Sequence, residues 1–293
     1  MRPTVAIIVL NWNNRTDTLD CIRSLQTIDY SEKDIIVVDN GSTDGSEVAI
    51  REKYPGITLH QTGKNLGFAG GNNAGIRLAM DKGYDYILLL NNDTEVDPSF
   101  LSALVNAAES DPAIGIAGSK IYYYSDPMRI WFAGGSISLQ SGDLHHVGEN
   151  EADKGQFDRM KDTDYITGCS MLIKRKVLED VGLLYEPLFL YYEDSDFCAH
   201  ARRQGYRVVY VPASIVRHKV SSTTGKVKDQ QLFYGTRNML IFEKRNAGFL
   251  NLLAFLPYYF GKFIVYNAVR ALLEGNTARA KVILKAAYEG LTL

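Results

Sequence analysis

The chain has 293 residues, of which 46% are apolar and 23% are charged, so it can bury a substantial core and is neither disordered nor collagen-like. Its 32 Lys and Arg residues nearly balance its 34 Asp and Glu residues, and this net charge of −2 argues against a nucleic-acid binder. Three cysteines without a CxxC pair indicate a reducing compartment, and the N-terminus lacks the apolar segment of a signal peptide.

Strand and helix signals alternate over the first 110 residues. Apolar runs that end in polar clusters predict strands buried on both faces, and apolar residues at helical spacing lie between them. We predict strands at 5–10, 34–39, 57–61 and 86–90, and helices at 17–27, 46–54, 69–82 and 98–110. This alternation predicts an α/β fold with a doubly wound, mostly parallel sheet.

The pattern changes after residue 110. Strands and turns alternate over 114–148, and the polar segment 149–164 is predicted to be an exposed loop. Further strands are predicted at 170–174, 206–211 and 214–216, and helices at 176–181 and from the acidic turn 193–196 to 204. We expect one domain over 1–240, with halves 1–110 and 111–240, followed by a helical segment over 241–293.

Three of the predicted strands end in polar clusters, at 11–13, 39–44 and 91–93. Ligands of open α/β sheets bind outside the carboxyl ends of the strands, so three such clusters predict a lined crevice. Asp39 directly follows four apolar residues, where a carboxylate needs a hydrogen-bond donor such as the imide N–H of a nucleobase. The residues after it, beginning with Asn40, also fit an ordinary turn, and that alternative stays open.

A glycine-rich segment at 64–73 opens the third predicted helix. Its backbone amides could approach a phosphate at the positive end of that helix. A tight turn followed by close packing of the helix explains the same residues equally well. The segment is neither a dinucleotide-binding fingerprint nor a P-loop.

Asp93 closes the last polar cluster. Carboxylate and carbonyl oxygens suit Mg²⁺ or Mn²⁺, but a single carboxylate needs phosphate oxygens and a second protein ligand to hold the ion. His218 follows a short predicted strand. By itself it fits a hydrogen-bonded structural histidine as well as a metal ligand.

A second acidic cluster contains Glu193, Asp194 and Asp196, behind an aromatic and apolar segment. The helix dipole stabilises a carboxylate at a helix N-terminus, which explains one of the three. Neighbouring like charges and partial burial raise a carboxyl pKa, as a general base requires. We therefore interpret this cluster as catalytic.

These clusters, in this order, resemble glycosyltransferase family 2 enzymes of the GT-A fold, and the resemblance spans residues 4–240. The subgroup that the chain looks most like includes rhamnosyltransferases of bacterial polysaccharide assembly. The matching segments include IIVVDNGSTDGS (35–46), NLGFAGGNNAG (65–75), LLLNNDTEV (88–96), ITGCSMLIKR (166–175), FLYYEDSDFCAHARRQGYRVVYVP (189–212) and FYGTRNML (233–240).

The resemblance implies a role for each cluster. The nucleotide would be bound by Asn11, Asn13, Asp39, Asn40, Asn65, Gly70, Asn72, Asn91, Asn92 and Arg237. Mn²⁺ or Mg²⁺ would be bound by Asp93 and His218; Asn91 replaces the first Asp of the family's DxD motif, which removes one negative charge. Asp194 would be the base, with Glu193 as the alternative, and the sugar or acceptor would lie near Gly168, Cys169 and Ser170.

The implied reaction transfers a sugar with inversion from a nucleotide diphosphate sugar, dTDP-rhamnose or a UDP-sugar, to a hydroxyl of a saccharide or lipid-linked acceptor. A sugar nucleotidyltransferase is one alternative, but it would carry a glycine-rich loop with a basic residue where this chain has 11–14. A non-catalytic protein that binds sugar nucleotides is another, and both Asp93 and the Glu193–Asp194 pair argue against it.

The aromatic segment 249–273 has no role in these motifs. Its length suffices to span a bilayer at about 1.5 Å per residue, but Pro257, Gly261 and Lys262 interrupt it. A helical pair lying at a membrane interface fits the sequence better than a bilayer span does. Packing on the catalytic domain or on a second subunit fits it as well as the interfacial pair does. A lipid-linked acceptor would place the protein in the cytoplasm, at the inner face of the plasma membrane.

Overall fold

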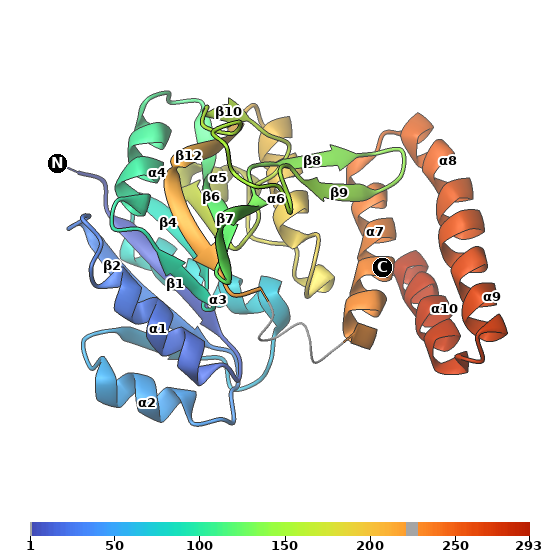
Figure 1. Cartoon of the computed structure of the whole chain (residues 1–293), viewed down its shortest axis with the longest axis horizontal. Helices are drawn as coiled ribbons and strands as arrows, with labels where there is room; N and C mark the ends of the chain where they lie inside the picture. The colour runs from blue at the N-terminus through green and yellow to red at the C-terminus, as the bar shows by residue number, and fades with distance from the viewer. Residues whose placement is uncertain (1, 221–227) are drawn as a thin grey trace.

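The computed structural model describes residues 2–220 and 228–293. Its main sheet has ten strands in the order β10-β12-β6-β11-β4-β1-β2-β3, with β5 paired to β12 and β7 paired to β6 (Figure 1). These strands are β1 (Val5–Asn11), β2 (Lys33–Asp39), β3 (Thr58–Gln61), β4 (Tyr86–Asn91), β5 (Thr94–Val96), β6 (Ile114–Tyr123), β7 (Asp126–Phe132), β10 (Lys161–Asp162), β11 (Ser170–Lys174) and β12 (Arg207–His218). A separate hairpin consists of β8 (Gly135–Ser138) and β9 (Asp143–His146).

The first half of the chain confirms the predicted alternation. Strands β1, β2, β3 and β4 are parallel to one another, while β11 enters antiparallel between β4 and β6. Residues 5–9 of β1 and 36–38 of β2 are fully buried because helices pack on the sheet. The helices of this half are α1 (Arg15–Leu25), α2 (Ser46–Lys53), α3 (Gly67–Lys82) and α4 (Phe100–Glu109).

One prediction for the second half needs correction. The two strands predicted at 206–211 and 214–216 are one strand, β12, whose pairing with β6 shifts between Val211 and Ile215. Pro212 removes a backbone donor at this irregularity, which is why the sequence pattern looks broken there. The segment 149–164 is mostly exposed, as predicted, and it is anchored to the sheet because the buried Lys120 ammonium donates to Asp153 at 2.9 Å.

The C-terminal helices form a group of their own beside the sheet, and Figure 1 shows the β8–β9 hairpin reaching toward them. Phe242, Phe255, Tyr259 and Ile283 share one buried cluster, and the Tyr259 hydroxyl donates to the Thr236 carbonyl at 2.9 Å. The remaining helices are α5 (Arg175–Val181), a 3₁₀ turn (Glu186–Leu188), α6 (Glu193–Arg203), α7 (Lys228–Asn246), α8 (Phe249–Pro257), a π-helical stretch (Tyr258–Val265), α9 (Tyr266–Leu273) and α10 (Thr277–Thr292).

The continuous helical stretch Phe249–Leu273 is apolar and long enough to cross a membrane, with a mean hydropathy of 1.3. Only 17% of its most apolar window is buried against the rest of the protein. One such helix is weak evidence for membrane insertion, since length and composition are all that it satisfies. It does explain where the aromatic residues lie: one side packs on α7 and α10, and the other is exposed.

Candidate active site

The carboxyl ends of β1, β2 and β4 bring the first group of polar residues together. Pairing places Asn11 opposite Asp39 on β2, and Leu10 opposite Asn91 on β4. Asp39 is 1% exposed, and its carboxylate accepts hydrogen bonds from Asn11 Nδ2 at 3.2 Å and Gln61 Nε2 at 2.9 Å. These protein donors hold the carboxylate in place, and its oxygens can accept further hydrogen bonds from a ligand.

Asn40 ties the glycine-rich turn to the end of β2. Its Nδ2 donates to the Gly67 carbonyl at 3.0 Å and to Asn65 Oδ1 at 3.1 Å, and its Oδ1 accepts from the Leu66 amide at 3.0 Å. Asn40 and Asn65 therefore use their side chains to shape the start of α3. Whether they also contact a nucleotide stays a prediction.

The glycines of α3 allow the helix to lie directly on the sheet. A Cβ at Gly71 would lie 2.4 Å from Leu10 Cδ1, and one at Gly75 would lie 2.7 Å from Ile8 Cγ2. A Cβ at Gly70 would lie 2.8 Å from the Leu66 side chain, and Asn72 Nδ2 donates to the Phe68 carbonyl. Close packing thus accounts for these glycines without a phosphate.

Two further asparagines extend the network along α1. Asn92 Nδ2 donates at 2.8 Å to the Thr18 hydroxyl, which itself donates at 2.8 Å to Asn11 Oδ1. Asn13 has a positive φ of 51°, and its Oδ1 accepts from the Thr43 amide at 2.7 Å. The strand ends are therefore fixed by side-chain hydrogen bonds before any ligand binds.

Two consecutive residues, Gly168 and Cys169, connect the remaining parts of the site. The Gly168 amide donates to Asp194 Oδ2 at 2.9 Å, and the Cys169 carbonyl accepts from the Asn91 amide at 3.0 Å. The Cys169 side chain lies against His218 and raises the pKa of the His218 imidazole. Since consecutive Cα atoms are about 3.8 Å apart, this connection brings the predicted base and the predicted metal ligands to one place.

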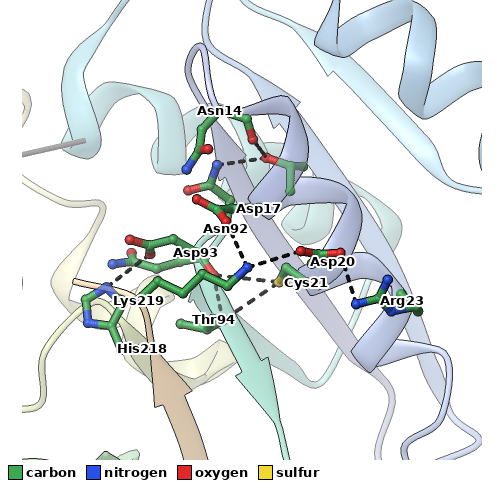
Figure 2. Close-up of polar contacts among 12 residues, drawn as sticks. Asn14, Asp17, Asp20, Cys21, Arg23, Asn92, Asp93, Thr94, His218 and Lys219 are labelled. Carbon is green, nitrogen blue, oxygen red and sulfur yellow. Dashed lines mark hydrogen bonds and ion pairs between the residues drawn. The ribbon is translucent and has the colours of Figure 1, made fainter. Parts of the chain in front are cut away.

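Asp93 and His218 meet as the resemblance implies. His218 Nε2 lies 3.0 Å from Asp93 Oδ1, and both side chains are buried (Figure 2). Burial alone would lower the pKa of His218, but the neighbouring Cys169 and Asp93 raise it to about 10. The antiparallel pairing of β12 with β5 sets this contact, because it places His218 opposite Thr94, the residue after Asp93.

The pair fits a divalent cation. Adjacent ligands of an octahedral ion at about 2.1 Å are about 3.0 Å apart, which matches the spacing of these two atoms. Within residues 2–220 and 228–293, no group of three His, Cys, Asp or Glu side chains is arranged to hold a metal. An ion here would therefore depend on oxygens of a bound diphosphate for its remaining ligands.

The second acidic cluster divides into three environments. Asp194 is half-buried and accepts from the amides of Gly168 and Ser195. Glu193 is buried, its Oε2 has no partner among the described residues, and burial and the Asp194 charge raise its pKa well above the ordinary value. Asp196 is held by Arg245 at 3.0 Å and belongs to the contact with α7. Only Asp194 both faces the site and retains access to solvent.

Two other predicted site residues are engaged elsewhere. Arg237 Nη2 donates to the Pro187 carbonyl at 2.6 Å and the Leu188 carbonyl at 3.0 Å, so contact with a diphosphate would require these bonds to break. Ser170 is fully buried, and its hydroxyl lies 2.7 Å from that of Ser119. Of the residues 168–170, Gly168 and Cys169 border the site most directly.

Nothing in the sequence pattern marks Lys219 as a site residue. Its ammonium donates to Asp17 at 2.8 Å and to Asp20 at 3.1 Å on α1, and its amide donates to the Asp93 carbonyl at 2.9 Å (Figure 2). This clamp fixes the end of β12, directly after His218, against α1. A lysine beside a histidine carries no such signal in the sequence, because its partners lie about 200 positions away.

Comparison with known proteins supports a single family. Residues 6–182 match the model of glycosyl transferase family 2. An N-acetylglucosaminyl-diphospho-decaprenol L-rhamnosyltransferase of Mycobacterium tuberculosis is 29% identical over 218 residues, which cover 66% of this chain and 68% of that protein. A dTDP-rhamnosyl transferase of Shigella flexneri is 22% identical and covers 84% of this chain and 82% of its own length.

Solved structures agree on the fold. A mannosyltransferase of Pyrobaculum calidifontis, determined with GDP-Man and Mn²⁺, has a TM-score of 0.60 at 18% identity and covers 99% of this chain and 88% of its own. A TarS fragment of S. aureus has a TM-score of 0.60 at 15% identity, covering 97% of this chain and 81% of its own. These likenesses show a GT-A-like fold. The chain belongs to glycosyltransferase family 2 and is a glycosyltransferase similar to rhamnosyltransferases.

Proposed function

We propose that the protein transfers a sugar, with inversion, from a nucleotide diphosphate sugar to a hydroxyl of a saccharide or lipid-linked acceptor. The donor would be dTDP-rhamnose or a UDP-sugar, and the product would enter a polysaccharide of the cell envelope. The observation that carries this proposal is the joining of Asp194 and the Asp93–His218 pair through Gly168 and Cys169. A proton acceptor and a metal-binding pair would thereby serve one reacting centre.

The chemistry follows from this placement. Asp194 would accept the proton of the acceptor hydroxyl while the diphosphate leaves from the opposite face of the sugar, so one displacement inverts the anomeric centre. The Gly168 amide donates to Oδ2 of Asp194 and the Ser195 amide donates to Oδ1, and these two hydrogen bonds orient the carboxylate. Residues at the ends of β1, β2 and β4 would bind the nucleotide, with Asp39 on the base.

Asp93 and His218 would hold Mn²⁺ or Mg²⁺ next to the diphosphate. The ion, when bound, would stabilise the negative charge that develops on the leaving group. Burial raises the pKa of the Cys169 thiol, which makes its sulfur a poor nucleophile. A covalent cysteine mechanism is disfavoured for the same reason.

One experiment tests the proposal directly. The intact protein is screened by thermal shift against UDP-sugars, GDP-mannose and dTDP-rhamnose with Mn²⁺, and donors that stabilise it are assayed for release of the free nucleoside diphosphate. Release that requires an acceptor hydroxyl supports transfer. Consumption of pyrophosphate instead would identify a nucleotidyltransferase, and binding without turnover across many acceptors would identify a binding protein.

We also propose that the exposed apolar side of the C-terminal helices contacts the inner face of the plasma membrane. Leu250 and Leu273 are 79% and 84% exposed, and Lys262 and Arg270 lie on the same helical stretch. Apolar side chains with interspersed cations fit a helix that lies in the interface. A lipid-linked acceptor would be presented at that surface.

Point substitutions suit this test better than truncation, because α8 and α9 share a buried cluster with α7. Leu250→Glu combined with Leu273→Glu should reduce flotation with vesicles of anionic and zwitterionic phospholipid, while nucleotide binding stays unchanged. Val48→Glu, at a position 59% exposed on α2, is the matched control. A wild-type protein that never floats with vesicles would assign this surface to a second copy of the chain or another protein.

A further inference from the structure

Trp131 on β7 lies between two imidazoles. Its ring centroid is 4.5 Å from that of His218 and 4.6 Å from that of His146, at interplanar angles of 77° and 79°. The indole is only partly buried, whereas its neighbour Phe132 is fully enclosed. Trp131 therefore presents part of an aromatic surface next to the Asp93–His218 pair. Packing in the core does not explain this exposure, because an aromatic ring that only fills the core is enclosed, as Phe132 is.

His146 on β9 adds a polar atom to this surface. Its Nδ1 is enclosed and has no hydrogen-bond partner in the part of the chain that the structure describes. Burial lowers the pKa of His146, although Glu149 and Asp194 oppose the shift, so the ring is neutral near pH 7. An enclosed nitrogen without a partner is destabilising, and a ligand hydroxyl that donates to it would offset that cost.

These two side chains extend from the metal pair to the base. Trp131 contacts His218, and the charge of Asp194 acts on both His146 and Tyr165. In a displacement reaction the transferred sugar must lie between the diphosphate, which the metal pair would bind, and the base that deprotonates the acceptor. Trp131 borders this interval through its contact with His218, and His146 borders it within reach of the Asp194 charge.

We propose that Trp131 and His146 form the wall that binds the transferred sugar of the nucleotide donor. The inference rests on the proposed function and adds the residues that read the glycosyl group. A sugar offers C–H faces to an aromatic ring and hydroxyls that both donate and accept hydrogen bonds. A partly exposed indole beside a neutral imidazole nitrogen is complementary to both features, as expected of a small-molecule site.

The test separates recognition of the sugar from recognition of the nucleotide. Dissociation constants are measured by titration calorimetry with Mn²⁺ for UDP, UDP-glucose, dTDP and dTDP-rhamnose. The ratio between a nucleoside diphosphate and its sugar derivative reports the contribution of the sugar. We expect His146→Phe and Trp131→Ala each to reduce this ratio by about tenfold, the equivalent of one lost hydrogen bond or its apolar counterpart, while binding of the nucleoside diphosphate changes less than twofold.

His145→Ala provides the matched control, because His145 is the exposed neighbour of His146 on β9. Trp131→Phe keeps an aromatic ring and should fall between wild type and Trp131→Ala. An unchanged ratio in His146→Phe and Trp131→Ala would overturn the wall and leave the proposed function standing. Equal losses for the nucleoside diphosphate and its sugar would also overturn it, because Trp131 would then act only through His218.

Failure of the proposed function looks different. A wild-type protein that binds neither the nucleoside diphosphates nor their sugars would refute both proposals together. A wild type that binds UDP or dTDP but gains nothing from the attached sugar would refute the wall alone. Melting temperatures of every variant show whether a loss of binding comes from a loss of folding.

Discussion

The two sides of the crevice differ in how their polar atoms are satisfied. On the nucleotide side, the Asp39 carboxylate accepts hydrogen bonds from Asn11 and Gln61. The Asn40 side-chain amide donates to the Asn65 side chain and to the Gly67 carbonyl. On the metal and base side, His146 Nδ1 and Glu193 Oε2 are enclosed without a partner among the described residues. One side is completed by the fold, and the other leaves polar atoms for a ligand to complete.

The largest effect should come from the base. Asp194→Asn keeps the shape of the side chain and removes its ability to accept a proton, so sugar transfer should fall by about 10²- to 10⁴-fold. Affinity for the nucleoside diphosphate should stay within twofold, as measured by calorimetry. Glu193→Gln is assayed in parallel, and transfer that survives in Asp194→Asn but not in Glu193→Gln would assign the base to Glu193.

Loss of a metal ligand should have the next largest effect. His218→Ala removes one of the two protein groups in the Asp93–His218 pair and should weaken Mn²⁺-dependent nucleotide binding by about 10- to 100-fold. The measurement is nucleotide affinity with and without added Mn²⁺. Full transfer activity in EDTA would contradict the metal role altogether.

The difference between the two sides of the crevice can be tested by measuring the free energy of unfolding of one variant from each side. Asp39→Asn places an amide against the donors of Asn11 and Gln61, so the free energy of unfolding should drop by about 1–3 kcal/mol. His146→Phe removes an enclosed nitrogen that has no protein partner and should leave stability unchanged or raised. Urea denaturation of both variants decides this, and a large loss in His146→Phe would show that the imidazole is already satisfied.

This difference also explains what the sequence can predict. Asn11, Asp39 and Asn91 are recognisable because each ends an apolar strand, and parallel strands bring their carboxyl ends to one edge. The resemblance supplies Asp194 and His218, but the link between them through Gly168 and Cys169 depends on β11 lying antiparallel beside β4. Trp131, His146 and Lys219 come from strands or turns without a local signal, so only the tertiary structure identifies them.

The smallest expected effect on transfer activity concerns an enclosed carboxyl outside the site. Glu243 on α7 is fully buried, neither of its oxygens has a partner in the described part of the chain, and burial raises its pKa to about 8. The folded state therefore keeps a proton that the unfolded state loses above pH 4.5, so stability should fall as pH rises from about 5 to 8, by at most about 1.4 kcal/mol per pH unit.

Glu243→Gln removes this titratable carboxyl, so the fall in stability with rising pH should be absent. The variant should be the more stable protein at pH 8, as measured by urea denaturation at pH 5, 6.5 and 8. Transfer activity should be unaffected, because Glu243 lies on α7 outside the proposed site, and its charge acts on Tyr192. Parallel pH profiles for wild type and variant would mean that Glu243 is ionised and satisfied. An unpartnered polar atom would then be a weaker sign of a ligand on the metal and base side as well.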